Sequence, residues 1–185
     1  VRGTGVYVTR HGFGYTVFEH REDGIDSELW VFVATDAAVK FAVLKVRNVS
    51  GRSRRLSATG YVEWVLGDLQ PKTAMHVITD VDPKTVAVMA RNAYNTEFAE
   101  RVAFFDVDDP GRGVTGDRTE FLGRNGSLRS PAAMVRTRLS GKVGAALDPC
   151  AALQVPFDGA DGQERESVFR LGAGGNAADA AALVG

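Results

Sequence analysis

At 185 residues and 19.8 kDa, the chain has the length of one ordinary domain, and its 44% hydrophobic and 24% charged residues are typical of a globular protein. Twenty-two Lys and Arg balance 23 Asp and Glu, so the net charge of −1 provides no electrostatic reason to bind nucleic acid or an acidic membrane. The single cysteine, Cys150, excludes an internal disulfide, and no apolar run is long enough to span a bilayer.

Aromatic and β-branched runs recur along the chain between Gly, Asn, Asp and Pro, a pattern that predicts an all-β, antiparallel fold. The run Leu29–Thr35 is apolar almost throughout, as expected of a strand that is covered on both faces. No sustained 3.6-residue period precedes residue 176, which argues against a parallel sheet with crossover helices. Strands are predicted at Gly14–His20, Leu29–Thr35, Val39–Arg47, Leu56–Leu66, Ala74–Thr79, Thr85–Arg91, Arg101–Val107 and Ser167–Leu171.

Leu56–Leu66 shows the clearest alternation of apolar and polar residues. Its even positions, which include Trp64, form an apolar face that we expect in the core. Tyr61 points to the opposite face and is therefore a candidate for contact with a ligand or a second domain.

The segment from Asp108 to Asp148 is rich in Gly, Arg and Pro and has few strand signals. A connection of this length inside a compact domain is usually functional or packed on itself. It brings Asp117, Arg118, Glu120 and Arg124 close together in sequence. Arginine forks and carboxylates in such a cluster either pin the loop or grip sugar hydroxyls or phosphate, and both readings stay open.

Near the end of the chain, Asn176 is a predicted N-cap for a short helix over Ala177–Leu183. A helix of this length is marginal alone, so we expect it to pack on a part of the protein outside this chain. The chain therefore looks truncated at both ends, and it opens without methionine or a signal-peptide pattern.

The sequence contains no recognisable catalytic constellation, and we expect no metal and no cofactor. His11, His20 and His76 are not spaced as metal ligands, and Cys150 has no CxxC partner. Asp106, Asp108 and Asp109 offer oxygens to calcium, but a solvated loop is the more ordinary explanation. Aromatic rings that suit stacking on a pyranose are Tyr15, Trp30, Tyr61, Trp64 and Tyr94, although core packing explains such residues equally well.

Several collinear phrases together resemble one family. They are Arg10–Glu19 (RHGFGYTVFE), Gly60–Gly67 (GYVEWVLG), Arg91–Asn95 (RNAYN), Gly116–Arg124 (GDRTEFLGR) and Asp148–Gln154 (DPCAALQ). The set resembles the N-terminal carbohydrate-binding supersandwich domain of glycoside hydrolase family 94, formerly glycosyltransferase family 36, and most of all the phosphorylase-like region of cyclic β-1,2-glucan synthases.

The resemblance implies an antiparallel β-sandwich of the galactose-mutarotase type. Residues 1–172 would form the sandwich, without its first strands, and residues 173–185 would begin a helical linker. In the family this linker leads to an (α/α)6 barrel that carries the catalytic acid, so no catalytic residue is assigned in this chain.

The implied function is to bind or position a β-glucan oligosaccharide for that barrel, within the cytoplasmic part of a membrane-associated bacterial enzyme. The alternative is a purely structural sandwich that mediates interdomain or homodimer contacts. Residues expected to face the sugar or the barrel are Tyr15, Tyr61, Asp117, Arg118, Glu120 and Arg124.

Overall fold

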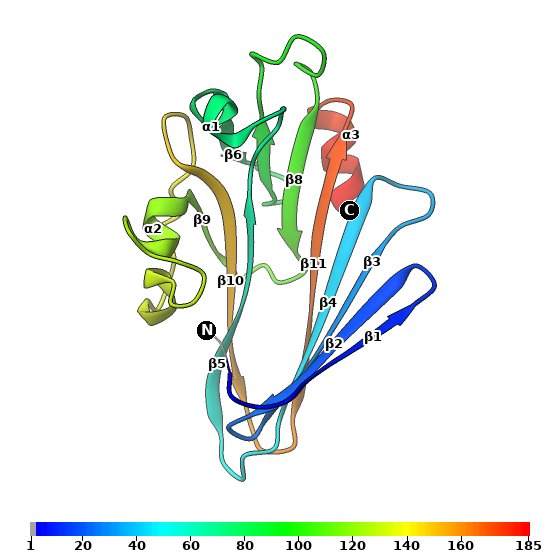
Figure 1. Ribbon diagram of the computed structural model, residues 1–185, viewed down its shortest axis with the longest axis vertical. Helices are drawn as coiled ribbons and strands as arrows, with labels where there is room; N and C mark the ends of the chain where they lie inside the picture. The colour runs from blue at the N-terminus through cyan, green and yellow to red at the C-terminus, as the bar shows by residue number, and fades with distance from the viewer. Residues whose placement is uncertain (1–2) are drawn as a thin grey trace.

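The computed structural model describes residues 3–185, and within this part of the chain eleven strands form two antiparallel sheets (Figure 1). The larger sheet has the order β1-β2-β3-β4-β11-β8-β7-β6, and the smaller has the order β5-β10-β9. The predicted all-β, antiparallel sandwich is confirmed. The strands are β1 (Tyr7–Gly12), β2 (Tyr15–Glu22), β3 (Ile25–Val33), β4 (Val39–Asn48), β5 (Arg54–Glu63), β6 (Ile78–Val81), β7 (Val88–Arg91), β8 (Val102–Val107), β9 (Gly113–Asp117), β10 (Pro149–Gly159) and β11 (Glu164–Gly174).

The two sheets join at one end, where the turn after β4 enters β5 and the turn after β10 enters β11 (Figure 1). The main core lies between the sheets, with fully buried Leu153 and Val155 of β10 facing Val107 and Phe169 of the larger sheet. Gly60 of β5 is placed where the Phe169 ring crosses the strand, because a Cβ atom there would come within 2.5 Å of that ring. A glycine on an otherwise apolar strand face thus allows the two layers to approach closely.

Besides the strands, residues 3–185 form two short α-helices, two 3-10 turns and one terminal α-helix. The short ones are α1 (Gln70–Thr73) with the 3-10 turn Ala74–His76, α2 (Arg118–Leu122) and the 3-10 turn Ala132–Val135. The predicted strand over Ala74–Thr79 is therefore wrong in its first half, because Pro71 starts a helical turn and the chain becomes extended only at Ile78. The predicted strand over Leu56–Leu66 ends early, at Glu63, and Leu66 itself is not extended, with a positive φ of 41°.

The segment Asp108–Asp148, in which few strand signals were expected, contains one short strand, and the strand that follows it was not predicted. Residues 113–117 form β9, and β10 is the central strand of the smaller sheet. Pro149 and Pro156 obscure β10 in the sequence, because proline cannot donate a hydrogen bond to a neighbouring strand. Burial of Cys150–Val155 on both faces compensates for this weak local signal.

The terminal helix α3 spans Ala177–Val184 and begins as predicted, with the Asn176 side chain accepting a hydrogen bond from the Asp179 amide at 3.0 Å. The prediction that this helix packs on a part of the protein outside the chain is wrong. Ala180 and Val184 are buried against Phe104 in a second apolar cluster on the larger sheet. The boundary between residues 1–172 and 173–185 stays a prediction.

The β1–β3 end of the larger sheet extends beyond the smaller sheet (Figure 1). Leu29–Thr35 was predicted to be covered on both faces, but β3 is half-buried along most of its length. Phe18 and Val33 are 43% and 60% exposed on the side that faces the smaller sheet's layer. This end of the sheet therefore presents an apolar surface.

Replacing Leu153 with alanine should lower the free energy of unfolding by about 2–5 kcal/mol, because its side chain is fully buried between the sheets. Urea unfolding followed by circular dichroism measures this change. Val135→Ala, at a side chain that is 91% exposed, is the control and should shift stability by less than about 0.5 kcal/mol. A loss below about 1 kcal/mol for Leu153→Ala would contradict a tightly packed interface between the sheets.

Candidate functional site

Four of the six site residues expected from the sequence lie together on the outer side of the smaller sheet. β9 runs directly into α2, so Asp117 caps the helix while Arg118 and Glu120 extend from its first turn. Tyr61 of β5 stacks on Phe121 of α2, with ring centroids 4.6 Å apart. The sequence placed Tyr61 on the face opposite Trp64, and Trp64 is indeed in the core at 4% exposure.

The polar groups of this cluster bind one another. Arg118 donates from Nε to Glu63 at 3.0 Å and from Nη1 to Asp148 at 3.1 Å, while the Tyr61 hydroxyl donates to Glu63 at 2.7 Å. The hydrogen bond from Tyr61 is the main cause of a lowered Glu63 pKa, and burial raises the pKa of Tyr61. Glu63 is a member that sequence reasoning missed, although its place two residues after Tyr61 on the same strand face was a usable signal.

Glu120 and Asp117 hold the long loop in the same way. Glu120 accepts hydrogen bonds from Thr115 Oγ1 at 2.7 Å, from the Ser140 amide at 3.0 Å and from Arg136 at 3.1 Å. Asp117 accepts from the Thr119 amide and from Lys142 Nζ at 2.6 Å. Because these hydrogen bonds already satisfy the side chains of Asp117, Arg118 and Glu120, they favour loop pinning over sugar contact.

Arg124 and Tyr15 do not join this cluster. Arg124 is exposed, and it forms no ion pair with the residues that the structure describes. Tyr15 lies on β2 in the other sheet, where it is 41% exposed and stacks on Trp30 with ring centroids 5.2 Å apart. The six predicted residues therefore do not form one site.

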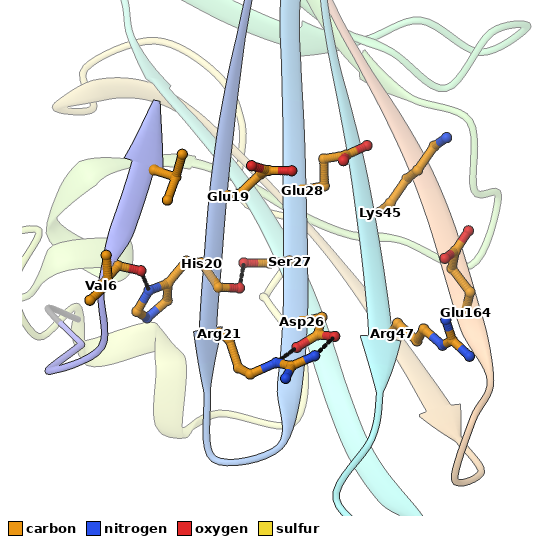
Figure 2. A pocket seen from close by; sticks show the side chains of 11 residues that line it. Val6, Glu19, His20, Arg21, Asp26, Ser27, Glu28, Lys45, Arg47 and Glu164 are labelled. Atoms are coloured by element: carbon orange, nitrogen blue, oxygen red, sulfur yellow. Dashed lines mark hydrogen bonds and ion pairs between the residues drawn. The ribbon is translucent and has the colours of Figure 1, made fainter. Parts of the chain in front are cut away.

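A shallow groove of about 410 Å³ crosses β1–β4 and β11, on the sheet face that also carries Tyr15 and Trp30. Figure 2 shows charged side chains in rows across these strands, with Glu19, Glu28 and Lys45 in one row. We call this feature the outer groove. It lies on the side of the larger sheet turned away from the smaller sheet, because Ala42 and Leu44 of β4 point into the core and Lys45 alternates with them.

A larger pocket of about 740 Å³ lies at the opposite end of the molecule from the turns that join the sheets. We call it the end pocket; its lining comes mainly from residues 66–76 and 92–101. The Tyr94 ring stacks on His76 with centroids 4.2 Å apart and an interplanar angle of 10°, yet Tyr94 remains 75% exposed. One ring face is thus supported while the residue stays open to solvent.

Polar groups hold the frame of the end pocket. Buried Asn92 donates from Nδ2 to the Leu66 carbonyl at 3.0 Å and accepts from the Tyr94 amide at 3.1 Å. Leu66 has a positive φ, a costly conformation for a leucine that this hydrogen bond helps to hold. On the far side, Arg101 lies 5.0 Å from the centroid of the Phe98 ring.

No cluster of three or more potential metal ligands occurs among residues 3–185. The acidic run that includes Asp106 and Asp109 is not a solvated loop, since Asp106 is buried against Arg112 and Arg170 and Asp109 pairs with Arg165. Cys150 is buried, and burial raises the pKa of its thiol, so it is a poor nucleophile. No described helix is long and apolar enough to cross a membrane.

Comparison with known proteins decides the family. A match to the family described as "Glycosyl hydrolase 94, supersandwich domain" spans residues 1–185. The chain belongs to this family. The family predicted from the collinear sequence phrases is thereby confirmed.

Relatives of this supersandwich domain are much longer proteins. The chain is 36% identical over 172 residues to the cyclic β-(1,2)-glucan synthase NdvB of Rhizobium meliloti, covering 92% of this chain and 6% of that protein. It is 27% identical to the N,N'-diacetylchitobiose phosphorylase of Vibrio furnissii, covering 91% of this chain and 22% of that protein.

The fold is also shared with a putative aldose 1-epimerase from Escherichia coli K12. The TM-score is 0.50 at 8% identity, over 92% of this chain and 69% of that one. This supersandwich domain is thus galactose-mutarotase-like in fold, and the likeness extends to the fold alone.

Substituting Glu120 with glutamine should cost about 1.5–3 kcal/mol at pH 7, because the charge-assisted bonds to Ser140 and Arg136 weaken. Burial raises the pKa of Glu120, but the bonds from Ser140 and Thr115 outweigh it and leave the pKa below the ordinary 4.5. A lowered pKa means that the carboxylate stabilises the fold above about pH 4.5 and stops doing so as the pH falls through its folded-state pKa.

The difference in unfolding free energy between wild type and Glu120→Gln should therefore shrink below pH 4.5. Urea titrations between pH 7 and pH 3 measure it, with Asp158→Asn, whose side chain is 89% exposed, as the control. A difference that stays constant to pH 3 would show that the Glu120 charge does not hold the loop.

Proposed function

We propose that this supersandwich domain is a non-catalytic module that binds and positions a β-glucan chain for a catalytic barrel elsewhere in a larger family 94 protein. The observation that carries the proposal is the exposed Tyr94 ring, stacked on His76 at the 740 Å³ end pocket. An aromatic face beside amide and charged groups suits a pyranose, which has apolar C–H faces and a polar rim.

The polar lining of the end pocket supports the same ligand class. Asn95 and Thr96 offer uncharged hydrogen-bonding groups, while Asp68 and Lys72 pair with each other at 3.1 Å. Compensated charges and amides recognise hydroxyls without favouring an anion. The choice of a β-glucan rests on NdvB, whose name gives a β-(1,2)-glucan as its product.

A second candidate is a structural module that contacts another domain or a second copy without sugar affinity. The exposed apolar side chains Phe18 and Val33 on the β1–β3 end of the larger sheet favour it. The two candidates differ in a simple readout, since only the first requires saturable binding of a saccharide. The expected cytoplasmic location within a membrane-associated parent stays a prediction.

Replacing Tyr94 with alanine should raise the dissociation constant for a β-1,2-linked glucooligosaccharide by about tenfold, since loss of one stacking contact costs about 1–1.5 kcal/mol. Chemical-shift titration of the ¹⁵N-labelled chain measures binding and reports whether residues 92–101 respond. Phe13→Ala, at a fully exposed aromatic on the β1–β2 turn, is the matched control and should bind as the wild type does.

If no saturable chemical-shift change occurs up to millimolar saccharide, the proposed sugar-binding function is contradicted. The structural module would be supported instead if no saturable shift occurs and if the chain self-associates in analytical ultracentrifugation, with less self-association in Phe18→Ser.

A further inference from the structure

The outer face of the larger sheet carries two adjoining surfaces of different chemistry. Cross-strand register places Tyr15 beside Phe32 and Phe32 beside Phe41, and the next row contains Trp30. Tyr15 stacks on Trp30, and Phe32 stacks on Phe41 with ring centroids 5.3 Å apart. This half of the face is aromatic, and Tyr15 leaves 41% of its surface open to solvent.

The other half is the outer groove. Figure 2 shows Glu19, Glu28 and Lys45 standing side by side on β2, β3 and β4, with Arg47 and Glu164 one row further along β4 and β11. The halves are joined by a hydrogen bond, because the Trp30 indole Nε1 donates to Glu28 Oε1 at 2.6 Å. From Tyr15 to Arg21, β2 extends for about 20 Å, which is long enough to contact several sugar units.

The charges of the outer groove compensate one another. Its lining contains four carboxylates and three Arg or Lys side chains besides His20. Arg10 reaches Glu19 at 2.7 Å, and Lys45 lies 3.7 Å from Glu166. Arg47 lines the groove and forms no ion pair within 4.0 Å among the described residues, although its charge acts on Asp26, its cross-strand neighbour.

We propose that this outer face is a second saccharide-binding surface, separate from the end pocket. The Tyr15–Trp30 pair forms the stacking platform, and Glu28, Lys45 and Arg47 donate to and accept from sugar hydroxyls. The ligand class of this surface rests on the proposed function, whereas its location rests on the residues named here.

An uncharged oligosaccharide suits both halves of the outer face at once. A balanced set of charges attracts neither a polyanion nor a cation strongly, while densely placed donors and acceptors match a ligand with many hydroxyls. An aromatic platform that continues directly into such a groove requires an apolar face and a polar rim in the same molecule. An uncharged oligosaccharide has both, and an extended one follows the strands from the platform into the groove.

Trp30 itself provides a site-specific reporter. The chain contains two tryptophans, and the other, Trp64, is buried in the core, so a Trp64→Phe chain retains only Trp30. In that background a β-1,2-linked glucooligosaccharide should change the Trp30 emission in a saturable way. Tyr15→Ala should raise the dissociation constant measured at Trp30 by about tenfold, and Arg47→Ala should raise it by a few-fold.

Two matched variants locate the effect. Phe13→Ala removes an exposed aromatic from the same hairpin as Tyr15 and should leave the Trp30 titration unchanged. Tyr94→Ala should also leave it unchanged while weakening shifts in residues 92–101. Circular dichroism and the dispersion of ¹⁵N–¹H spectra establish that each variant is folded.

Every outcome bears on one of the two sites. If Trp30 emission does not change at millimolar saccharide, or if Tyr15→Ala binds as tightly as its parent, the outer-face site is overturned. Shifts at residues 92–101 in the same experiment would still support the end pocket. A Trp30 response without shifts at residues 92–101 supports the outer face and removes the end pocket. Tighter binding of a sulfated oligosaccharide than of the neutral one overturns the assignment of an uncharged ligand.

Discussion

One buried carboxylate ties together the elements on which the rest of the sandwich depends. Asp106 of β8 is 1% exposed and accepts hydrogen bonds from Arg112 at 2.7 Å and from Arg170 of β11 at 2.7 Å. Burial raises the pKa of Asp106, and the two guanidinium groups oppose this rise.

Arg112 also donates to the carbonyl oxygens of Val107 and Asp109, which closes the turn from β8 into β9. The same network continues to the end of the chain, since Arg170 donates to the Val184 carbonyl at the end of α3. A buried charge of this kind is tolerated only when it is paired, and here the pairing connects β8, β11 and the end of α3.

This framework decides which surfaces are closed and which are open. The outer side of the smaller sheet is covered by α2 and by the loop that Glu120 and Asp117 pin. The sequence cluster that contains Asp117, Arg118 and Glu120 is therefore occupied by contacts within the fold. The larger sheet is covered by α3 only near Phe41 and Phe104, which leaves the Tyr15–Trp30 platform and the outer groove open. The end pocket is open because its loops project beyond both sheets (Figure 1). The two surfaces proposed to bind saccharide therefore lie where the sheets are uncovered, whereas the polar side chains of the loop in the middle of the chain bind one another.

The family assignment limits what the fold says about activity. The galactose-mutarotase-like arrangement is shared with an epimerase at 8% identity, and fold without a matching site does not carry function. The chain spans between 6% and 22% of the relatives it matches, so their activities belong to longer proteins.

The sequence alone determined the all-β class, the alternation of β5, the core position of Trp64, the Asn176 cap and the family, because each depends on local periodicity, local capping or a collinear pattern. It did not reveal β9 and β10, since prolines and glycines weaken their local signals and burial on both faces stabilises them instead. It brought Asp117, Arg118 and Glu120 to attention but could not choose between pinning and binding. Only the tertiary structure supplied Glu63, Asp148, Arg136 and Ser140 as their partners, from positions as far as 55 residues away in the case of Arg118 and Glu63. It likewise separated Tyr15 from Tyr61 by placing them on different sheets, and it brought His76 beneath Tyr94. Such contacts depend on strand order and register, which a single sequence does not encode in any local pattern.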